Sequence, residues 1–240
     1  MSRSQRSTIV FFFTCTLLLG LTLLFDLYPP EFTARGQEAA FAWPVALSVI
    51  VIGTLGLLAE RALGFPTPFE DARRERTGIV WSTVTGGAYG LITIGAYIYF
   101  RQNHPLATSE WAHLPLPWSI PFYVYGAIFL EFLLRLGALC IVFWLLHVMI
   151  FRGRFRSGLF WFVNCFVALY EILPYVQENL DRGNWLGVLA TPIDPLYWSN
   201  VFEGLLLLRF GWLAPIIFRI SFYIVWHILF GGLAKQYFVP

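Results

Sequence analysis

Long hydrophobic segments alternate along the chain with short polar segments that hold most of the charged residues. The segments are continuously apolar, unlike the strands of a membrane β-barrel, which alternate apolar and polar residues. An α-helix needs about 20 apolar residues to cross the hydrocarbon core of a bilayer. The pattern predicts an all-α fold, a polytopic transmembrane bundle of about seven helices. We place these helices at residues 8–28, 43–64, 78–100, 119–151, 157–175, 195–208 and 212–233.

Three of these segments depart from a simple crossing. Residues 119–151 would form a helix nearly 50 Å long, against a hydrocarbon core of about 30 Å, so this helix must tilt, kink or protrude. Residues 195–208 are short for a full crossing. Residues 8–28 could be a signal peptide, but they run into Asp26 and Pro29 without a cleavage site, which favours an uncleaved anchor.

A pair of glycines in the third segment, Gly86 and Gly90, has the GxxxG spacing that lets another helix approach closely. Membrane helices are rich in Gly, so an ordinary composition explains the pair equally well. Both interpretations remain open at this point.

Composition supports a membrane protein without a separate soluble domain. The chain has 240 residues, of which 58% are hydrophobic and 12% charged, and its mean hydropathy is +0.67. We predict a single membrane domain, with the first three helices in residues 1–118 and the remaining helices in residues 119–233. The net charge of +2 excludes a nucleic-acid partner. Cys15, Cys140 and Cys165 lie inside apolar segments and are expected to be packing residues.

Basic residues are divided unequally between the loops, which predicts the orientation. With a cytoplasmic N-terminus, that side carries ten of them: Arg3, Arg6, Arg61, Arg73, Arg74, Arg76, Arg152, Arg154, Arg156 and Arg209. The other side carries Arg35, Arg101, Arg182 and Lys235. We expect an integral protein of a bacterial inner membrane with its N-terminus in the cytoplasm, and loops at about 101–118 and 176–194 that cap the bundle outside.

Ionisable residues inside membrane helices are the candidates for a functional site, because each is costly unless it is paired. They are Glu131, Arg135, His147, Glu171, Glu203, Arg219 and His227. Glu131 and Arg135 stand one turn apart on one face and are expected to neutralise each other. Arg219 needs an anion, and Glu171 and Glu203 are available. We therefore predict a polar network of Glu131, Arg135, Glu171, Glu203 and Arg219 that links the last four helices.

The two histidines of this set are expected in different places. His227 lies two turns beyond Arg219 on the same face, whereas His147 lies about 24 Å along the helix from Glu131 and is expected at the interface. The network is either a catalytic or substrate site or a buried clamp that fixes helix packing. No HExxH motif or Cys/His cluster indicates a metal, and no motif indicates a cofactor.

One stretch of sequence resembles a known family. Residues 125–137, YGAIFLEFLLRLG, followed by VFWLL at 142–146, are similar to the first motif helix of the CPBP (CAAX protease and bacteriocin-processing) intramembrane proteases. In that helix a Gly-Ala-Ile lead-in precedes EExxxR and a stretch rich in Leu, Val and Trp. The resemblance covers residues 119–233.

The resemblance implies a degenerate catalytic site. The family's first Glu, which activates water, falls on Leu130, while its second Glu and its Arg are present as Glu131 and Arg135. The FxxxH motif falls on residues 168–172, where Phe and His are absent and Glu171 is next to the vacant position. The final HxxxN or HxxxD motif places Arg219 at the His and Tyr223 at the Asn or Asp.

Two histidines bear on this comparison without restoring the site. His227 corresponds to a secondary His that some members carry farther along the last helix. Phe143 and His147 match the FxxxH spacing, but they follow Glu131 in the same helix and cannot form a separate wall of a site.

These residues support two hypotheses about function. The first is a non-catalytic membrane protein that serves as an accessory or binding subunit for another membrane protein or a lipid-like ligand. The second is an active CAAX-type intramembrane endopeptidase with a rearranged set of Glu131, Arg135, Glu171 and His227. A transporter or channel is less favoured, because no inverted repeat or pair of broken helices is evident.

Overall fold

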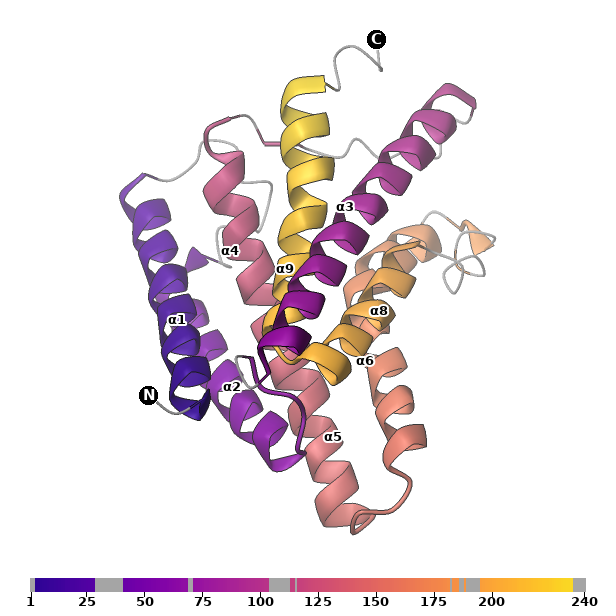
Figure 1. The fold of residues 1–240 in the computed structure, drawn as a ribbon. Helices are drawn as coiled ribbons and strands as arrows, with labels where there is room; N and C mark the ends of the chain where they lie inside the picture. Colours follow the sequence, from indigo (N-terminus) through magenta and orange to yellow (C-terminus); the bar gives the residue numbers. More distant parts are fainter. Residues whose placement is uncertain are drawn as a thin grey trace.

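The computed structural model describes residues 3–28, 41–68, 71–103, 113–114, 116–181, 183–185, 188 and 195–234, in which helices are joined by loops and no strand occurs. The helices form a bundle in which the first helix starts at the lower end and the last one finishes at the upper end in Figure 1. Arg35, Arg182 and Lys235, three of the residues used to predict the orientation, lie outside the described part, as do most residues of the two outer loops.

The helices follow the predicted order. They are α1 (Arg3–Leu27), α2 (Trp43–Ala62), α3 (Ala72–Asn103), α4 (Ser119–Glu131), η3 (Phe132–Ile141), α5 (Val142–Trp144), η4 (Leu145–Ile150), α6 (Arg156–Asp181), α8 (Pro195–Phe210), α9 (Leu213–Tyr223) and η6 (Ile224–Ala234). Within the described residues, six uninterrupted helical stretches are long and apolar enough to cross a membrane. With the 16-residue α8, they confirm a polytopic helical bundle of about seven spans.

Three helices extend beyond the segments predicted from hydropathy. α1 begins at Arg3 instead of residue 8, α3 begins at Ala72 instead of residue 78, and α6 continues through Pro174 to Asp181. The apolar pattern marks only the part of a helix in the hydrocarbon core, so polar turns at the interface were missed. Pro174 lies inside α6, which membrane helices tolerate because neighbouring groups satisfy the freed backbone.

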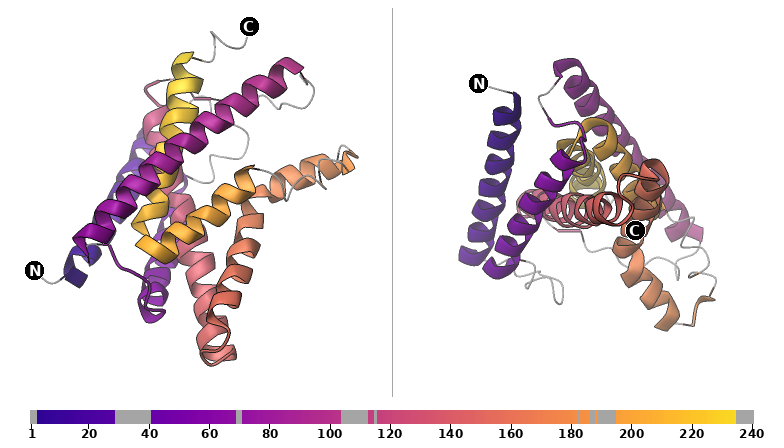
Figure 2. Two further views of the ribbon diagram at one scale, coloured as in Figure 1. Left: turned by 45° about the vertical axis from the view of Figure 1, so that its right-hand side comes forward. Right: turned by 90° about the horizontal axis from the view of Figure 1, so that it is seen from below.

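The long fourth segment is one continuous helix over residues 119–150, in which η3 and η4 have π-helical turns and α5 lies between them. A π turn has hydrogen bonds from i to i+5 and so rotates the following side chains relative to an α-helix. The lower end of this helix, together with the start of α6, reaches farther down than the other helices in Figures 1 and 2. Its extra length therefore protrudes from the bundle.

The main hydrophobic core joins helices from both halves of the chain. Phe11 of α1 stacks on Phe132 of η3 with ring centroids 5.1 Å apart, and it meets Trp212 edge-on at 5.6 Å. Phe143 packs against Phe160 of α6 in the same core. The first two helices therefore share one hydrophobic core with helices from residues 119–233.

Small residues allow the closest helix contacts. A Cβ at Gly86 of α3 would collide with the Phe218 carbonyl of α9, and one at Gly90 would lie 2.7 Å from Cβ of Val225. Of the two interpretations of the GxxxG pair, the structure supports the close approach of a second helix.

Most of the basic residues gather at one end of the bundle. Arg61, near the end of α2, donates from Nη2 to Oγ1 of Thr8 at 2.8 Å, and Arg156, at the start of α6, donates to the Leu63 carbonyl at 2.7 Å. Gly211, after α8, lies against Pro66 of the loop that follows α2. The beginnings of α1, α3 and α6 and the ends of α2 and α8 therefore share this basic end.

Candidate functional site

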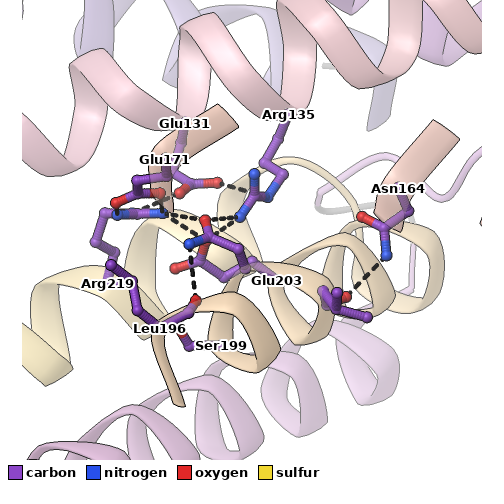
Figure 3. Close-up of polar contacts among 10 residues, drawn as sticks. Glu131, Arg135, Asn164, Glu171, Leu196, Ser199, Glu203 and Arg219 are labelled. Atoms are coloured by element: carbon purple, nitrogen blue, oxygen red, sulfur yellow. Dashed lines mark hydrogen bonds and ion pairs between the residues drawn. The ribbon is translucent and has the colours of Figure 1, made fainter. Parts of the chain in front are cut away.

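Arg219 of α9 lies at the centre of an ion cluster buried inside the bundle. Its Nε donates to Oε1 of Glu131 at 2.6 Å, and its Nη1 and Nη2 donate to the two oxygens of Glu171 at 2.7 and 3.1 Å. Its Nη2 also donates to Oε2 of Glu203 at 2.6 Å and to Oδ1 of Asn200 at 3.1 Å. One guanidinium therefore links α9 to α4, α6 and α8 (Figure 3).

Arg135 of η3 forms the second cationic centre. Its Nη2 donates to Oδ1 of Asn200 at 2.6 Å and to Oε2 of Glu203. Asn200 is itself fixed because its Nδ2 donates to the Leu196 carbonyl at 2.9 Å, one turn earlier in α8. The two arginines thus bind the same pair of α8 side chains, Asn200 and Glu203, from η3 and from α9.

The cluster contains the ion pair that the sequence predicts, together with shorter contacts that the sequence does not predict. Nε of Arg135 lies 3.6 Å from Oε2 of Glu131, but the two side chains share no hydrogen bond. Their short contacts run to other helices, to Arg219 and to Glu203. The main interactions of both residues therefore hold helices together instead of stabilising one helix.

The five predicted residues are brought together and are largely shielded from the surface. Glu131, Arg135, Glu203 and Arg219 are 1 to 3% exposed, and the Glu171 side chain is 16% exposed. Counted as ionised, the cluster carries three carboxylates and two guanidinium groups, so it has one negative charge in excess. Glu171, at the edge of the cluster, is the carboxylate closest to the surface.

A few polar atoms of the cluster have no hydrogen-bond partner. They are Oε2 of Glu131 and the Nε and Nη1 atoms of Arg135, which lie beside one another. Buried donors and acceptors of this kind are usually satisfied by water. By contrast, both carboxylate oxygens of Glu171 and Oε2 of Glu203 accept hydrogen bonds from the guanidinium group of Arg219.

His227, the fourth residue of the alternative catalytic set, lies in a different environment. Its ring stacks on Tyr123 with centroids 4.0 Å apart and lies 5.2 Å from Tyr223 and 5.3 Å from His113. Within the described part of the chain, no hydrogen bond or ion pair joins His227 to Glu131, Glu171 or Arg135. Tyr223 lies between the two groups along the last helix, four residues after Arg219 and four before His227.

His147 lies at the basic end, far along the helix from the cluster. Its Nδ1 is 3.3 Å from the Arg154 carbonyl, and its ring stacks on Phe143 at 5.3 Å. The alternative FxxxH pair therefore lies on one helix, away from Glu131, as its spacing indicates.

Three buried polar residues were missed by the sequence analysis. Asn200 completes the cluster, and Asn164 of α6 donates to the Val201 carbonyl of α8 at 2.9 Å. Glu60 of α2 is fully buried, and its Oε1 accepts the Trp212 backbone N–H at 3.0 Å, where α9 begins. The two amides carry no charge and gave no signal, whereas Glu60 was available as an acid near the end of an apolar segment.

Among the described residues, no group of three or more His, Cys, Asp or Glu side chains is placed to bind a metal ion. Cys15, Cys140 and Cys165 are free thiols, two of them buried and one half-buried.

Fold and site together define an integral membrane protein, a polytopic helical bundle held by a buried ion cluster. Comparisons with protein-family models, curated proteins and solved structures found no match to this chain. Membership of the CPBP family therefore stays a hypothesis that rests on the residues from 125 to 146.

Proposed function

We propose that this chain is a non-catalytic membrane protein, similar to the CPBP proteases, that serves as an accessory or binding subunit for another membrane protein or a lipid-like ligand. The observation that carries the proposal is the closed ion cluster. Each of its three carboxylates is bound by a guanidinium group, and His227, the imidazole of the alternative catalytic set, belongs to a separate aromatic group.

Peptide hydrolysis needs a polarised water, a general base and a group that stabilises the oxyanion. Leu130, at the position of the family's water-activating Glu, packs with the hydrophobic core. Oε1 of Glu131 and both carboxylate oxygens of Glu171 accept hydrogen bonds from Arg219, so these oxygens fix the helices, while Oε2 of Glu131 has no partner among the described residues. Arg219 occupies the position of a family His and cannot act as a base.

The location of the protein belongs to the same proposal. We place it in a bacterial inner membrane with a cytoplasmic N-terminus, because the basic residues of five helix ends gather on one side and positive residues favour the cytoplasm. A reporter enzyme that is active only in the cytoplasm should then be active when it is fused within residues 151–155. A fusion there that reports export would reverse the orientation.

A cleavage assay separates the accessory role from the peptidase hypothesis. Membranes containing the wild type, Glu131→Gln, Glu171→Gln or His227→Phe are incubated with prenylated CAAX-type peptides and with a panel of membrane-protein substrates. The proposal predicts no cleavage above that of membranes without the protein. Cleavage that His227→Phe and Glu131→Gln abolish, in proteins that remain folded, would establish the peptidase instead.

Affinity purification tests the accessory role itself. The tagged protein is extracted in a mild detergent at its natural level of expression and compared with an unrelated tagged polytopic protein. We expect a membrane protein to co-purify in a fixed ratio and to be lost when the cluster is broken by Arg219→Met. A chain that always purifies alone contradicts the accessory role.

A further inference from the structure

An apolar groove faces outward between the long helix at residues 119–150 and α6, the two helices that protrude in Figures 1 and 2. Its volume is about 670 Å³. Leu134, Ala138 and Leu146 line one side at helical spacing, and Phe162, Phe166 and Tyr170 line the other. The Phe162 and Phe166 side chains are 67 and 68% exposed and form the outer edge, whereas Val163 and Val167 on the same helix are buried.

The groove ends at a basic loop, residues 151–155, between η4 and α6. The Gly153 N–H donates to the His147 carbonyl at 2.7 Å, and the Phe151 N–H donates to that of Leu146 at 2.8 Å. These bonds tie the loop to the end of the long helix, where Leu146 lines the groove. Gly153 has a φ of +82°, which an L side chain rarely adopts, so the turn depends on this glycine.

The loop and the start of α6 carry exposed arginines without an acidic counterpart. Arg152 and Arg154 form no ion pair with the described residues, and Arg156 donates to a backbone carbonyl. The sequence contains no Asp or Glu from residue 132 to residue 170. Basic residues at the membrane surface next to a pocket between transmembrane helices are typical of sites for anionic lipid headgroups.

The size of the groove indicates what occupies it. From Leu133 to Leu146 the groove follows the helix for about 20 Å, somewhat more than the depth of one leaflet, about 15 Å. A transmembrane helix about 10 Å wide would fill roughly 1,600 Å³ over that length, more than twice the volume of the groove. An extended hydrocarbon chain is much thinner and matches a long, narrow, wholly apolar groove.

We infer that this groove binds one acyl chain of an anionic phospholipid whose phosphate lies on Arg152 and Arg154. Phe151 and Phe155, which meet edge-on at 6.0 Å, flank the arginines at the level of the headgroups. The site does not depend on the proposed accessory role, since a chain that purifies alone can still retain the lipid.

Native mass spectrometry of the full-length protein tests the site. The protein is equilibrated in mild detergent with equal amounts of phosphatidylglycerol and phosphatidylcholine of the same acyl chains. We expect preferential retention of phosphatidylglycerol, which Arg152→Gln with Arg154→Gln lowers by roughly tenfold or more. Arg73→Gln with Arg74→Gln, at the same end of the bundle but on α3, is the matched control and should retain the preference.

Blocking the groove separates the acyl chain from surface charge. Ala138→Phe and, independently, Val142→Phe should lower retention of phosphatidylglycerol without changing the thermal unfolding temperature by more than a few degrees. Ala88→Phe, in the groove between α3 and α8, should leave retention unchanged. Three outcomes would overturn the inference. They are equal retention of phosphatidylglycerol and phosphatidylcholine by the wild type, the same loss of phosphatidylglycerol in the α3 control, and full retention of phosphatidylglycerol in both groove variants.

Discussion

Arg219 on α9 and Glu131 on α4 are joined by a hydrogen bond of 2.6 Å, although 88 residues separate them in the chain. A guanidinium is a permanent cation that cannot accept a proton, and that of Arg219 binds acids on three other helices at once. The pair is therefore part of a cross-link between helices.

Loss of Arg219 should destabilise the bundle severely. Arg219→Met leaves three buried carboxylates with only Arg135 as a cation, and removal of one partner of a buried ion pair costs about 3–5 kcal/mol. We expect a decrease of about 6 °C or more in the thermal unfolding temperature measured in detergent. Arg209→Met, an exposed arginine on α8, is the control and should change it little. Equal effects of the two substitutions would contradict the role given to Arg219.

Glu171 should be the most replaceable acid of the cluster. Glu171→Gln removes the excess negative charge and keeps an oxygen that can accept from Arg219, and the side chain is partly exposed. Its cost should be below about 1 kcal/mol. Arg135→Gln instead leaves three carboxylates for Arg219 alone and should cost at least about 2 kcal/mol more.

Denaturant titration in one detergent checks this order of stabilities. It compares the single variants Glu171→Gln and Arg135→Gln with the double variant Arg135→Gln with Glu203→Gln. The second substitution should restore part of the stability lost in Arg135→Gln, because Glu203 is the direct partner of Arg135. A larger loss of unfolding free energy in Glu171→Gln than in Arg135→Gln would contradict the assignment of one excess negative charge to the cluster.

Hydropathy alone was sufficient to predict the class of fold, because backbone groups in a bilayer must be satisfied within helices. It placed all seven helices but not the ends of α3 and α6, whose last turns lie where polar residues are tolerated. The π-helical turns of η3 and η4 had no signal in the sequence. Their identification depends on backbone geometry that hydrophobic spacing does not encode.

The members of the ion cluster followed from the cost of isolated charge in lipid, and spacing along one helix predicted the ion pair of Glu131 with Arg135. That spacing did not predict the shorter contacts that both residues make with other helices. Asn200 could not be recognised because a neutral amide in a helix carries no such cost. The position of His227 depends on rings from three segments, and its spacing from Arg219 says nothing about them.

The contact of α3 with α9 and η6 should depend on two glycines. Gly90→Ala places a methyl group 2.7 Å from Cβ of Val225, and overpacking of this kind costs about 1–3 kcal/mol. Gly86→Ala faces a carbonyl and should cost at least as much. Gly95→Ala in the same helix meets nothing within 4 Å and is the control. Unfolding temperatures that do not differ among the three variants would show that α3 is not packed in this way.

The beginning of α9 should depend on Glu60, a residue outside the ion cluster. Trp212 precedes the first residue of α9, no side chain of its own caps the helix, and its backbone N–H is bound by Glu60 at 3.0 Å in a fully buried position. A carboxylate there accepts a hydrogen bond from an N–H that would otherwise have no acceptor, and its negative charge interacts favourably with the positive end of the helix dipole. Glu60→Leu should therefore cost about 1–3 kcal/mol, whereas Glu60→Gln, which keeps an acceptor oxygen, should cost less than about 1 kcal/mol.

Amide hydrogen exchange adds a local measurement, since Glu60→Leu should accelerate exchange in residues 212–215 before it affects η6. Uniform loss of protection along the whole last helix would mean that Glu60 stabilises the bundle generally and does not cap α9.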